Sequence, residues 1–425
     1  MQLLGNIKWS AIGVLTRYSL QAASILVLSR LLSPDEFGQV AAVMIVISLA
    51  LVVSQLGMGQ LISSCNETEI NKKFSQSLII SPSIALIVIL SIYSSSDSIA
   101  HFFKIGDSAL LNSLLISILI RSIYSPLEGL FVHYYRFASI AKVDFISYFF
   151  GYFIVSISLS YNGYGSYSII LANIFQALFS LIVIITMFLK INFQFDFNFS
   201  LKEFITTLKR ALTISYSQLL SGFAAQVDNF FVNIHSGLGH LGIYTRAYQL
   251  MVVPCNFSGQ ILNRVIISRF SKDPEDYQGI IRLGLWLTLF LSTFISFTIS
   301  FFGLAFVGFL LGEGWDLVYI PLLILSFSIF PRMVYKIVEP VLISKKLERK
   351  LVISLKIYCI CLVLLCFLLK DYGLAGISFA VLLATHLYGG VSVYNLVAIY
   401  PNLKKSAVAA QLLSVIASLL IWNSQ

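Results

Sequence analysis

The sequence predicts an all-α polytopic membrane protein with about 12–13 transmembrane helices, arranged as two six-helix lobes related by a pseudo-twofold axis around a central cavity. Composition, hydrophobic blocks and an internal repeat support this fold class. The chain has 425 residues, of which 58% are hydrophobic and 11% charged, and its mean hydropathy is +0.89. Soluble proteins carry about 25% charged residues. The charge deficit therefore excludes an ordinary soluble globular fold.

Hydrophobic residues occur in blocks long enough to cross a membrane as helices. A helix needs about 20 residues to span the ~30 Å hydrocarbon layer. The first block carries Arg17 in its middle and no small-residue cleavage site follows it, so we do not expect a cleaved signal peptide. The predicted spans are 9–30, 37–62, 77–96, 109–132, 144–161, 165–189, 211–235, 241–263, 282–310, 317–343, 351–369, 374–399 and 406–422.

Basic residues are distributed unevenly between the loops on the two sides of the predicted membrane. With the N-terminus inside, 20 of the 28 Lys and Arg residues fall on one side and 3 on the other. The positive-inside rule then places the N-terminus in the cytoplasm. The same bias accounts for the net charge of +9, so no nucleic-acid partner is expected.

An internal repeat supports the two-lobe arrangement. The pattern Arg-x-x-Tyr-x-x-x-Glu occurs at Arg121 and again at Arg332, and shorter matches such as Gly59-Gln60 with Gly259-Gln260 recur at similar offsets. Because each half has an even number of spans, the repeat is parallel about an axis along the membrane normal. The predicted parts are a lobe at 1–189, a basic cytoplasmic linker at 190–210, a lobe at 211–399 and an additional hydrophobic segment at 400–425.

Charged side chains inside predicted spans are the first candidate site residues. A charge at bilayer depth costs at least ~2.5–3.5 kcal/mol, so such residues are usually functional or paired. In the first copy, Arg121 and Glu128 share one helix face and enclose Tyr124. Two interpretations stay open: a hydrated cavity in which basic groups hold an anionic ligand and a carboxylate titrates, or a structural ion pair.

The second copy is richer in charge. Arg332, Lys336 and Glu339 stand at i, i+4 and i+7 and share one face, with Tyr335 between them. Because Lys336 has no counterpart in the first copy, we expect this copy to hold an anion more tightly than Arg121 does.

Arg17 in the first span and Asp228 in the first span of the second half are two further intramembrane charges. We expect them either to line the cavity or to form a pair between the lobes.

Patterns typical of enzymes and of metal sites are not found. The five histidines are scattered, and the five cysteines lack metal-ligand spacing. The glycine pairs at 57–59 and 237–239 are not phosphate loops, because neither follows a strand or is followed by the Lys-Ser/Thr pair, and the sequence has no Walker motif. We therefore predict a protein that is not an enzyme, with no cofactor, no metal and no direct use of ATP.

Four segments resemble a known family: SRLLSPDEFGQVA (29–41), QLGMGQLI (55–62), QVDNFFVNIHSGLGHLGIYTRAYQLMVVPCN (226–256) and SRFSKDPED (268–276). They are similar to the polysaccharide transporter family, that is, the Wzx-type O-antigen flippases of the multidrug/oligosaccharidyl-lipid/polysaccharide exporter superfamily. Members usually have twelve or fourteen spans, whereas thirteen are predicted here.

The resemblance implies a flippase that moves an undecaprenyl-pyrophosphate-linked oligosaccharide, such as an O-antigen or similar surface polysaccharide unit, from the cytoplasmic to the periplasmic leaflet of the bacterial inner membrane. Alternating access driven by H⁺ or Na⁺ is implied, with membrane lipid, a polysaccharide polymerase and chain-length proteins as partners. The implied contacts to the substrate are Arg17, Arg121, Tyr124, Arg332, Tyr335 and Lys336. The implied sites for the coupling ion are Glu128, Asp228 and Glu339.

Two other functions stay open. One is a small-molecule or multidrug antiporter of the same superfamily, against which the excess of basic residues in the predicted cavity argues. The other is a polytopic polysaccharide polymerase or ligase, which the short outer loops disfavour.

Overall fold

The computed structural model describes residues 19–197, 200–270, 277–345 and 347–423. In these ranges every regular element is helical, and no strand occurs. The chain divides into two compact units, Met1–Phe223 (unit 1) and Ala224–Gln425 (unit 2). Each unit is described by itself.

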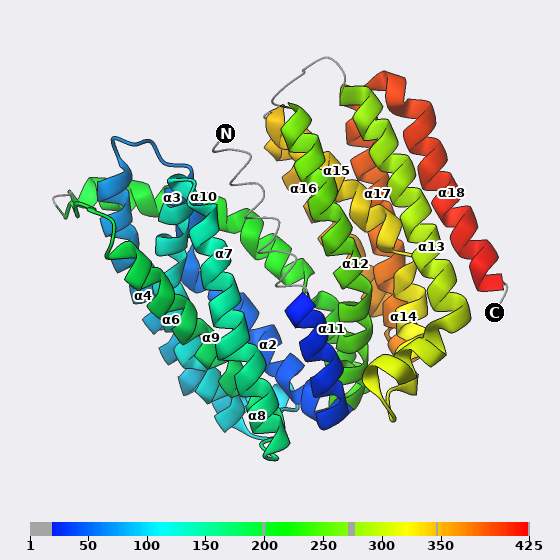
Figure 1. Ribbon diagram of the computed structural model, residues 1–425, viewed down its shortest axis with the longest axis horizontal. Coiled ribbons are helices and arrows are strands. Elements are labelled where there is room, and N and C mark those ends of the chain that lie inside the picture. The colour runs from blue at the N-terminus through cyan, green and yellow to red at the C-terminus, as the bar shows by residue number, and fades with distance from the viewer. Residues whose placement is uncertain (1–18, 198–199, 271–276, 346, 424–425) are drawn as a thin grey trace. The chain divides into compact units, whose positions relative to one another are not determined.

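Unit 1 is a bundle of long helices (Figure 1). α9 packs against both α6 and η1, and α4 packs against α2 and α6. The elements are α2 (Pro34–Gln55), α3 (Met58–Ser63), α4 (Ile70–Ser94), α5 (Ser96–Phe102), α6 (Ser108–His133), α7 (Phe137–Ile146), the π-helix η1 (Ser147–Ile154), α8 (Val155–Tyr161), α9 (Ser166–Phe188) and α10 (Leu201–Ala224).

The start and end of α2 follow from local sequence. Ser33 and Glu36 form a capping box, in which each side chain bonds the other residue's backbone amide. The helix ends where Leu56 and Gly57 both adopt positive φ, at 45° and 60°. The short α3 then crosses α6 closely at Gly59 and Gly129, because a Cβ on Gly129 would overlap the Gly59 carbonyl. This crossing lies beside Glu128, one of the candidate site residues.

α10 packs against unit 1 rather than serving as a free connection. The Thr207 hydroxyl donates a hydrogen bond of 2.6 Å to Gln76 Oε1, and Lys72 Nζ lies 2.7 Å from Glu203 Oε1. Ala211 is part of the buried core around Phe74. The compact units therefore divide after Phe223, whereas the predicted repeat begins its second half at 211. The boundary after Phe223 reflects packing in the folded chain. The boundary at 211 reflects the proposed duplication of the sequence, and that duplication stays a prediction.

Unit 2 has the longer helices, with α13 and α18 side by side and α17 behind them (Figure 1). Its core includes Leu285, Phe330, Val334 and Ala407. The elements are α11 (Val227–Ser236), α12 (Leu238–Phe270), α13 (Tyr277–Leu311), the 3₁₀ turn η2 (Asp316–Val318), α14 (Tyr319–Ser326), α15 (Ile329–Ser344), α16 (Glu348–Leu369), η3 (Lys370–Tyr372), α17 (Gly373–Ile399), η4 (Pro401–Leu403) and α18 (Lys404–Asn423).

The span 317–343 is broken in its middle. Asp316–Ser326 and Ile329–Ile343 are long and apolar enough to span a membrane only when taken together, and they are bent by 49° relative to each other. Pro331 follows the break, and a proline has no N–H to donate to the carbonyl four residues earlier. That carbonyl belongs to Phe327. Broken spans of this kind expose backbone groups at membrane depth, where carriers commonly place binding sites.

The all-α polytopic fold class is confirmed. Among the described residues, eight helices are long and apolar enough to cross a membrane, or nine if the bent pair counts as one span. One of these eight, Glu348–Ile399, contains two helices, α16 and α17, which pack against each other. Helices or helix pairs coincide with every predicted hydrophobic segment from 37–62 onward, and most of 9–30 lies outside the described residues.

Candidate functional site

Asp228 is buried at the start of α11 in unit 2, with 4% of its surface exposed. α11 begins at Val227, with Gln226 as its N-cap, so Asp228 lies in the first turn. There the unpaired backbone amides and the positive end of the helix dipole stabilise its carboxylate. The Asn229 amide donates to Asp228 Oδ1 at 2.9 Å, and the Tyr244 hydroxyl donates to Oδ2 at 2.8 Å. Both oxygens therefore have partners inside unit 2.

Arg332 lies at the start of α15, directly after the break, and is 8% exposed. Its Nε donates to the Ser328 hydroxyl at 3.2 Å, and its Nη1 donates to the Tyr248 hydroxyl at 3.0 Å. The guanidinium carbon also lies 5.0 Å from the centroid of the Tyr248 ring, a cation–π contact. Its Nη2 is buried and has no hydrogen-bond partner among the described residues. Nε and Nη1 of the guanidinium thus have hydrogen-bond partners among the described residues, and Nη2 does not.

Tyrosines from four helices surround this guanidinium, and we refer to them as the tyrosine cluster. Arg332 interacts electrostatically with Tyr248, Tyr335 and Tyr358. The ring centroid of Tyr388 lies 5.1 Å from that of Tyr335 and 5.2 Å from that of Tyr358. These residues come from α12, α15, α16 and α17. Tyrosine hydroxyls can both donate and accept, so the cluster gives Arg332 a polar yet aromatic surrounding.

Asp228 and Arg332 belong to one electrostatic network. Asp228 interacts with Arg332 across unit 2. Lys336, one turn after Arg332 on α15, interacts with both Arg332 and Glu339. Arg332 is buried, Lys336 half-buried and Glu339 exposed, so charge runs along one face of α15 from the interior to the surface. The structure thus brings together the sequence-predicted residues of the second half.

The predicted residues of the first half lie in unit 1. Arg121, Tyr124 and Glu128 are on α6, all three are half-buried, and each makes interactions with its surroundings. α6 contains Pro126 in its interior, as α15 contains Pro340. Both copies of the motif therefore lie on proline-containing helices. Arg17 lies outside the described residues.

Sequence reasoning missed most of the tyrosine cluster. Tyr244 and Tyr248 are four residues apart on α12, so they share the face that meets Asp228 and Arg332. A Tyr-x-x-x-Tyr spacing on the helix that follows the one carrying Asp228 could have identified these two tyrosines as candidate site residues. The sequence contains 21 tyrosines, and nothing in their local surroundings distinguishes Tyr358 and Tyr388.

No group of three or more His, Cys, Asp or Glu side chains that could hold a metal ion occurs in the described part of the chain. The five cysteines are free thiols. The arrangement can bind an anion at Arg332 and Lys336, and Asp228 provides a carboxylate held in place by its neighbours.

The spans long enough to cross a membrane, the buried charges within them and the broken helix define a polytopic helical membrane protein. Residues 27–321 match the family described as polysaccharide biosynthesis protein. Because this match covers more than half of the chain, the protein belongs to that family, which confirms the resemblance drawn from the sequence.

Solved structures share the fold. The chain is similar to the lipid II flippase MurJ in an inward closed conformation, with a TM-score of 0.78, 17% identity, and 98% of this chain and 92% of that chain covered. It is also similar to an inward-facing multidrug resistance MATE family transporter of the MOP superfamily, with a TM-score of 0.67, 15% identity, and 96% of both chains covered.

A third similar structure is a MOP superfamily transporter from Pyrococcus furiosus, with a TM-score of 0.62, 15% identity, and 98% and 96% of the two chains covered. At this identity these likenesses establish the fold alone.

The chain is also similar to part of a curated relative. The amylovoran biosynthesis protein AmsL of Erwinia amylovora is 24% identical over 230 residues, which cover 53% of this chain and 58% of that protein. The match thus spans little more than half the length of AmsL.

Proposed function

We propose that this protein is a flippase that moves an undecaprenyl-pyrophosphate-linked oligosaccharide from the cytoplasmic to the periplasmic leaflet of the bacterial inner membrane by alternating access. The observation that carries the proposal is the half-satisfied guanidinium of Arg332: Nε and Nη1 are engaged, while Nη2 is buried without a hydrogen-bond partner among the described residues. A buried charged donor without a partner costs free energy, and a ligand that supplies an acceptor recovers it.

A diphosphate fits this donor set. Guanidinium and phosphate pair strongly through charge-assisted hydrogen bonds. Lys336, one turn further along α15, adds a second positive charge on the same face. The tyrosine hydroxyls add neutral donors and acceptors that suit a sugar attached to the diphosphate. In unit 1, Arg121 and Tyr124 supply corresponding groups, with one cation fewer on that helix face.

The carboxylates are the proposed sites of ion coupling. Asp228 is held by Tyr244 and by the start of α11 and interacts with Arg332, so a cation bound near it would change the electrostatic potential at the anion site. Glu339 and Glu128 stand one and two turns from the cationic residues of their helices. We propose H⁺ or Na⁺ as the coupling ion, and polymerase and chain-length proteins as partners.

Complementation of a strain that lacks the gene tests this function. Arg332→Ala should abolish surface polysaccharide and cause lipid-linked oligosaccharide to accumulate, at unchanged protein level. Arg349→Ala, at an exposed position on α16, is the matched control and should behave as wild type. Normal polysaccharide in the Arg332→Ala strain would exclude the proposed site. A deletion strain that keeps its polysaccharide and becomes sensitive to cationic drugs would instead support a multidrug antiporter.

A further inference from the structure

His386 on α17 contacts a backbone carbonyl that lacks its usual helical partner at the broken span of unit 2. Because Pro331 has no N–H, the Phe327 carbonyl cannot make the usual hydrogen bond within the helix. His386 Nε2 lies 3.2 Å from the Phe327 oxygen. A carbonyl can only accept, so Nε2 carries the proton in this contact.

The other ring nitrogen faces the side chain of Gln411 on α18. Gln411 Nε2 lies 3.4 Å from His386 Nδ1, so the amide N–H donates to a neutral imidazole. Gln411 Oε1 is buried and has no hydrogen-bond partner among the described residues. A half-turn of the amide exchanges its oxygen and nitrogen and places an acceptor at Nδ1. The Gln411 side chain can therefore donate to Nδ1 of the neutral ring and, after this rotation, accept from Nδ1–H of the doubly protonated ring.

α17 packs closely against the break near His386. Gly389, one turn after His386, packs so tightly that an added Cβ would lie 2.6 Å from Pro331 Cβ. The same Cβ would lie 3.6 Å from Gln411 Nε2. Helices α15, α17 and α18 thus approach one another here. The imidazole of His386 links the α14–α15 break to α18 through Phe327 and Gln411.

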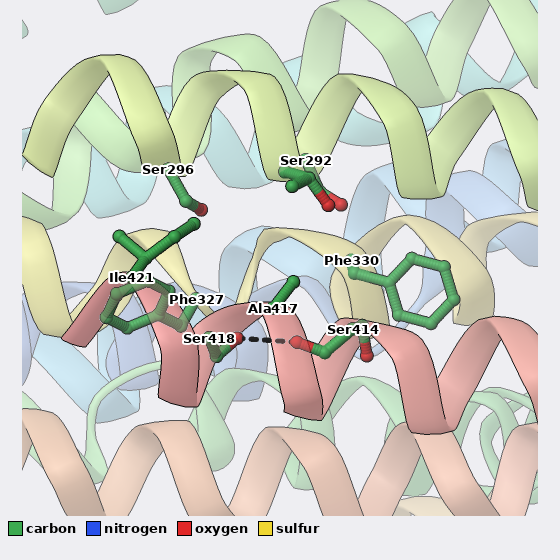
Figure 2. A pocket seen from close by; sticks show the side chains of 9 residues that line it. Ser292, Ser296, Phe327, Phe330, Ser414, Ala417, Ser418 and Ile421 are labelled. Atoms are coloured by element: carbon green, nitrogen blue, oxygen red, sulfur yellow. Dashed lines mark hydrogen bonds between the residues drawn. The ribbon is translucent and has the colours of Figure 1, made fainter. Parts of the chain in front are cut away.

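A small crevice lined by serine side chains and by Phe327 and Phe330 lies next to this junction. Figure 2 shows serine side chains of α13 and α18 on either side of Phe327 and Phe330. The crevice has a volume of about 10 Å³, roughly the space that one water molecule needs. Ser414 lines it and donates to the backbone carbonyl of Gln411 at 2.7 Å. A water molecule there would lie next to Phe327, whose carbonyl contacts His386.

In the part of the chain that the structure describes, the polar contacts of the His386 ring are with the Phe327 carbonyl and the Gln411 side chain. The helices packed against α17 carry further titratable groups, among them Asp228 on α11, Tyr319 on α14, Arg332, Tyr335, Lys336 and Glu339 on α15, Tyr358 on α16, and Lys404 and Lys405 at the start of α18.

We propose that His386 is a reversible proton-binding site that couples protonation to the α14–α15 break. A proton passes from water to Nδ1, the Gln411 amide turns its oxygen to accept from Nδ1–H, and the ring gains one positive charge. The bond from Nε2–H to the Phe327 carbonyl then becomes charge-assisted and stronger, so the protonated state holds the break more firmly against α17. This inference rests on the proposed transport function and adds His386 to the carboxylates as a site where a coupling proton binds.

Solution NMR of the full-length protein in lipid nanodiscs, labelled with ¹⁵N-histidine, measures the protonation directly. His386→Gln identifies the His386 signals by their loss. Between about pH 8.5 and about pH 5, we expect the ring to change from the Nε2–H tautomer to imidazolium. Gln411→Leu should lower the midpoint by about one pH unit, a tenfold change in proton affinity, and Gln411→Glu should raise it. Gln278→Leu on α13 is the control and should leave it unchanged.

A His386 ring that stays neutral over this range would overturn the proposal. So would a midpoint that moves no further in the two Gln411 variants than in Gln278→Leu. The measurement needs no substrate, so it separates the two hypotheses. A normal titration in a protein that does not transport contradicts the proposed function alone, and a missing titration in an active transporter contradicts this inference alone.

Discussion

The Arg332 guanidinium meets Tyr248 in two ways: Nη1 donates to the tyrosine hydroxyl at 3.0 Å, and the guanidinium carbon lies 5.0 Å from the centroid of the same ring. One tyrosine of α12 therefore holds one edge of the guanidinium on α15. The remaining nitrogen, Nη2, is left buried without a partner among the described residues. A fixed cation with one unused edge is prepared to bind an anion without reorganisation.

Tyr248→Phe separates the two contacts. The variant keeps the aromatic ring but leaves Nη1 without its acceptor, so we expect a loss of stability of about 1–3 kcal/mol, seen as a lower melting temperature of the purified protein. Tyr394→Phe, at an exposed position on the neighbouring α17, serves as the control. Equal melting temperatures for the two variants would show that the hydroxyl of Tyr248 does not position Arg332.

The pair formed by Asp228 and Tyr244 allows a double-mutant cycle. Tyr244→Phe leaves Asp228 Oδ2 buried without its donor at 2.8 Å, which should cost about 1–3 kcal/mol. Asp228→Asn combined with Tyr244→Phe should cost less than the sum of the two single variants, because residues in contact couple by about 0.5–3 kcal/mol. Thermal unfolding of the four proteins measures this coupling. Strict additivity would exclude a functional contact between the two side chains.

The approach of α17 to Pro331 is tested at two adjacent glycines. Gly389→Ala forces a Cβ within 2.6 Å of Pro331 Cβ, and such overpacking costs about 1–3 kcal/mol. Gly390→Ala adds the same methyl group where no atom lies within 4 Å, and alanine favours a helix over glycine by up to about 1 kcal/mol. We therefore expect opposite shifts of the melting temperature. Shifts of the same sign and size would contradict the close packing of α15 and α17.

The fold followed from the sequence to a large extent because hydrophobic block length is a local property. The segments around Ser33, Ser108 and Ser166 each start a helix where an apolar block begins, so span positions needed no knowledge of tertiary contacts. The breaks were harder to predict. Pro331 was visible in the sequence, but neither the 49° bend nor the close packing of Gly389, 58 residues later on α17, against this proline could be read from it.

The candidate site was predictable only in its charges. Arg332, Lys336 and Asp228 stand out because a charge within an apolar block costs free energy. Their neutral partners carry no such signal: Tyr358 resembles many other polar residues within helices, and its place beside Arg332 arises from packing between helices distant in sequence. The repeat of the Arg-x-x-Tyr-x-x-x-Glu pattern located both helices, α6 and α15, but not the residues facing them.

The contact between α10 and α4 in unit 1 should depend on pH. The hydrogen bond from Lys72, at 2.7 Å, and that from the Ser200 amide lower the pKa of Glu203 from its usual 4.5 to about 2. A carboxylate with a lowered pKa in the folded protein stabilises it above about pH 4.5, and this contribution is lost as the pH falls towards 2.

Melting temperatures of wild type and Glu203→Gln, measured from neutral pH downward, test this sign. Their difference should be constant down to about pH 4.5 and shrink below it. Glu348→Gln at the start of α16, also at an exposed position, is the control. A difference that persists unchanged at about pH 3 would show that the ionised carboxylate of Glu203 does not support the contact.

The central claim is that Arg332 binds the diphosphate of a lipid carrier, and direct binding of undecaprenyl pyrophosphate to the full-length protein in nanodiscs tests it. We expect Arg332→Ala to weaken binding by at least about tenfold, the equivalent of 1.4 kcal/mol. Arg332→Lys should restore part of the loss, because it returns the charge without the planar donor geometry, and Arg349→Ala should bind as wild type. Wild-type affinity in Arg332→Ala would contradict the account.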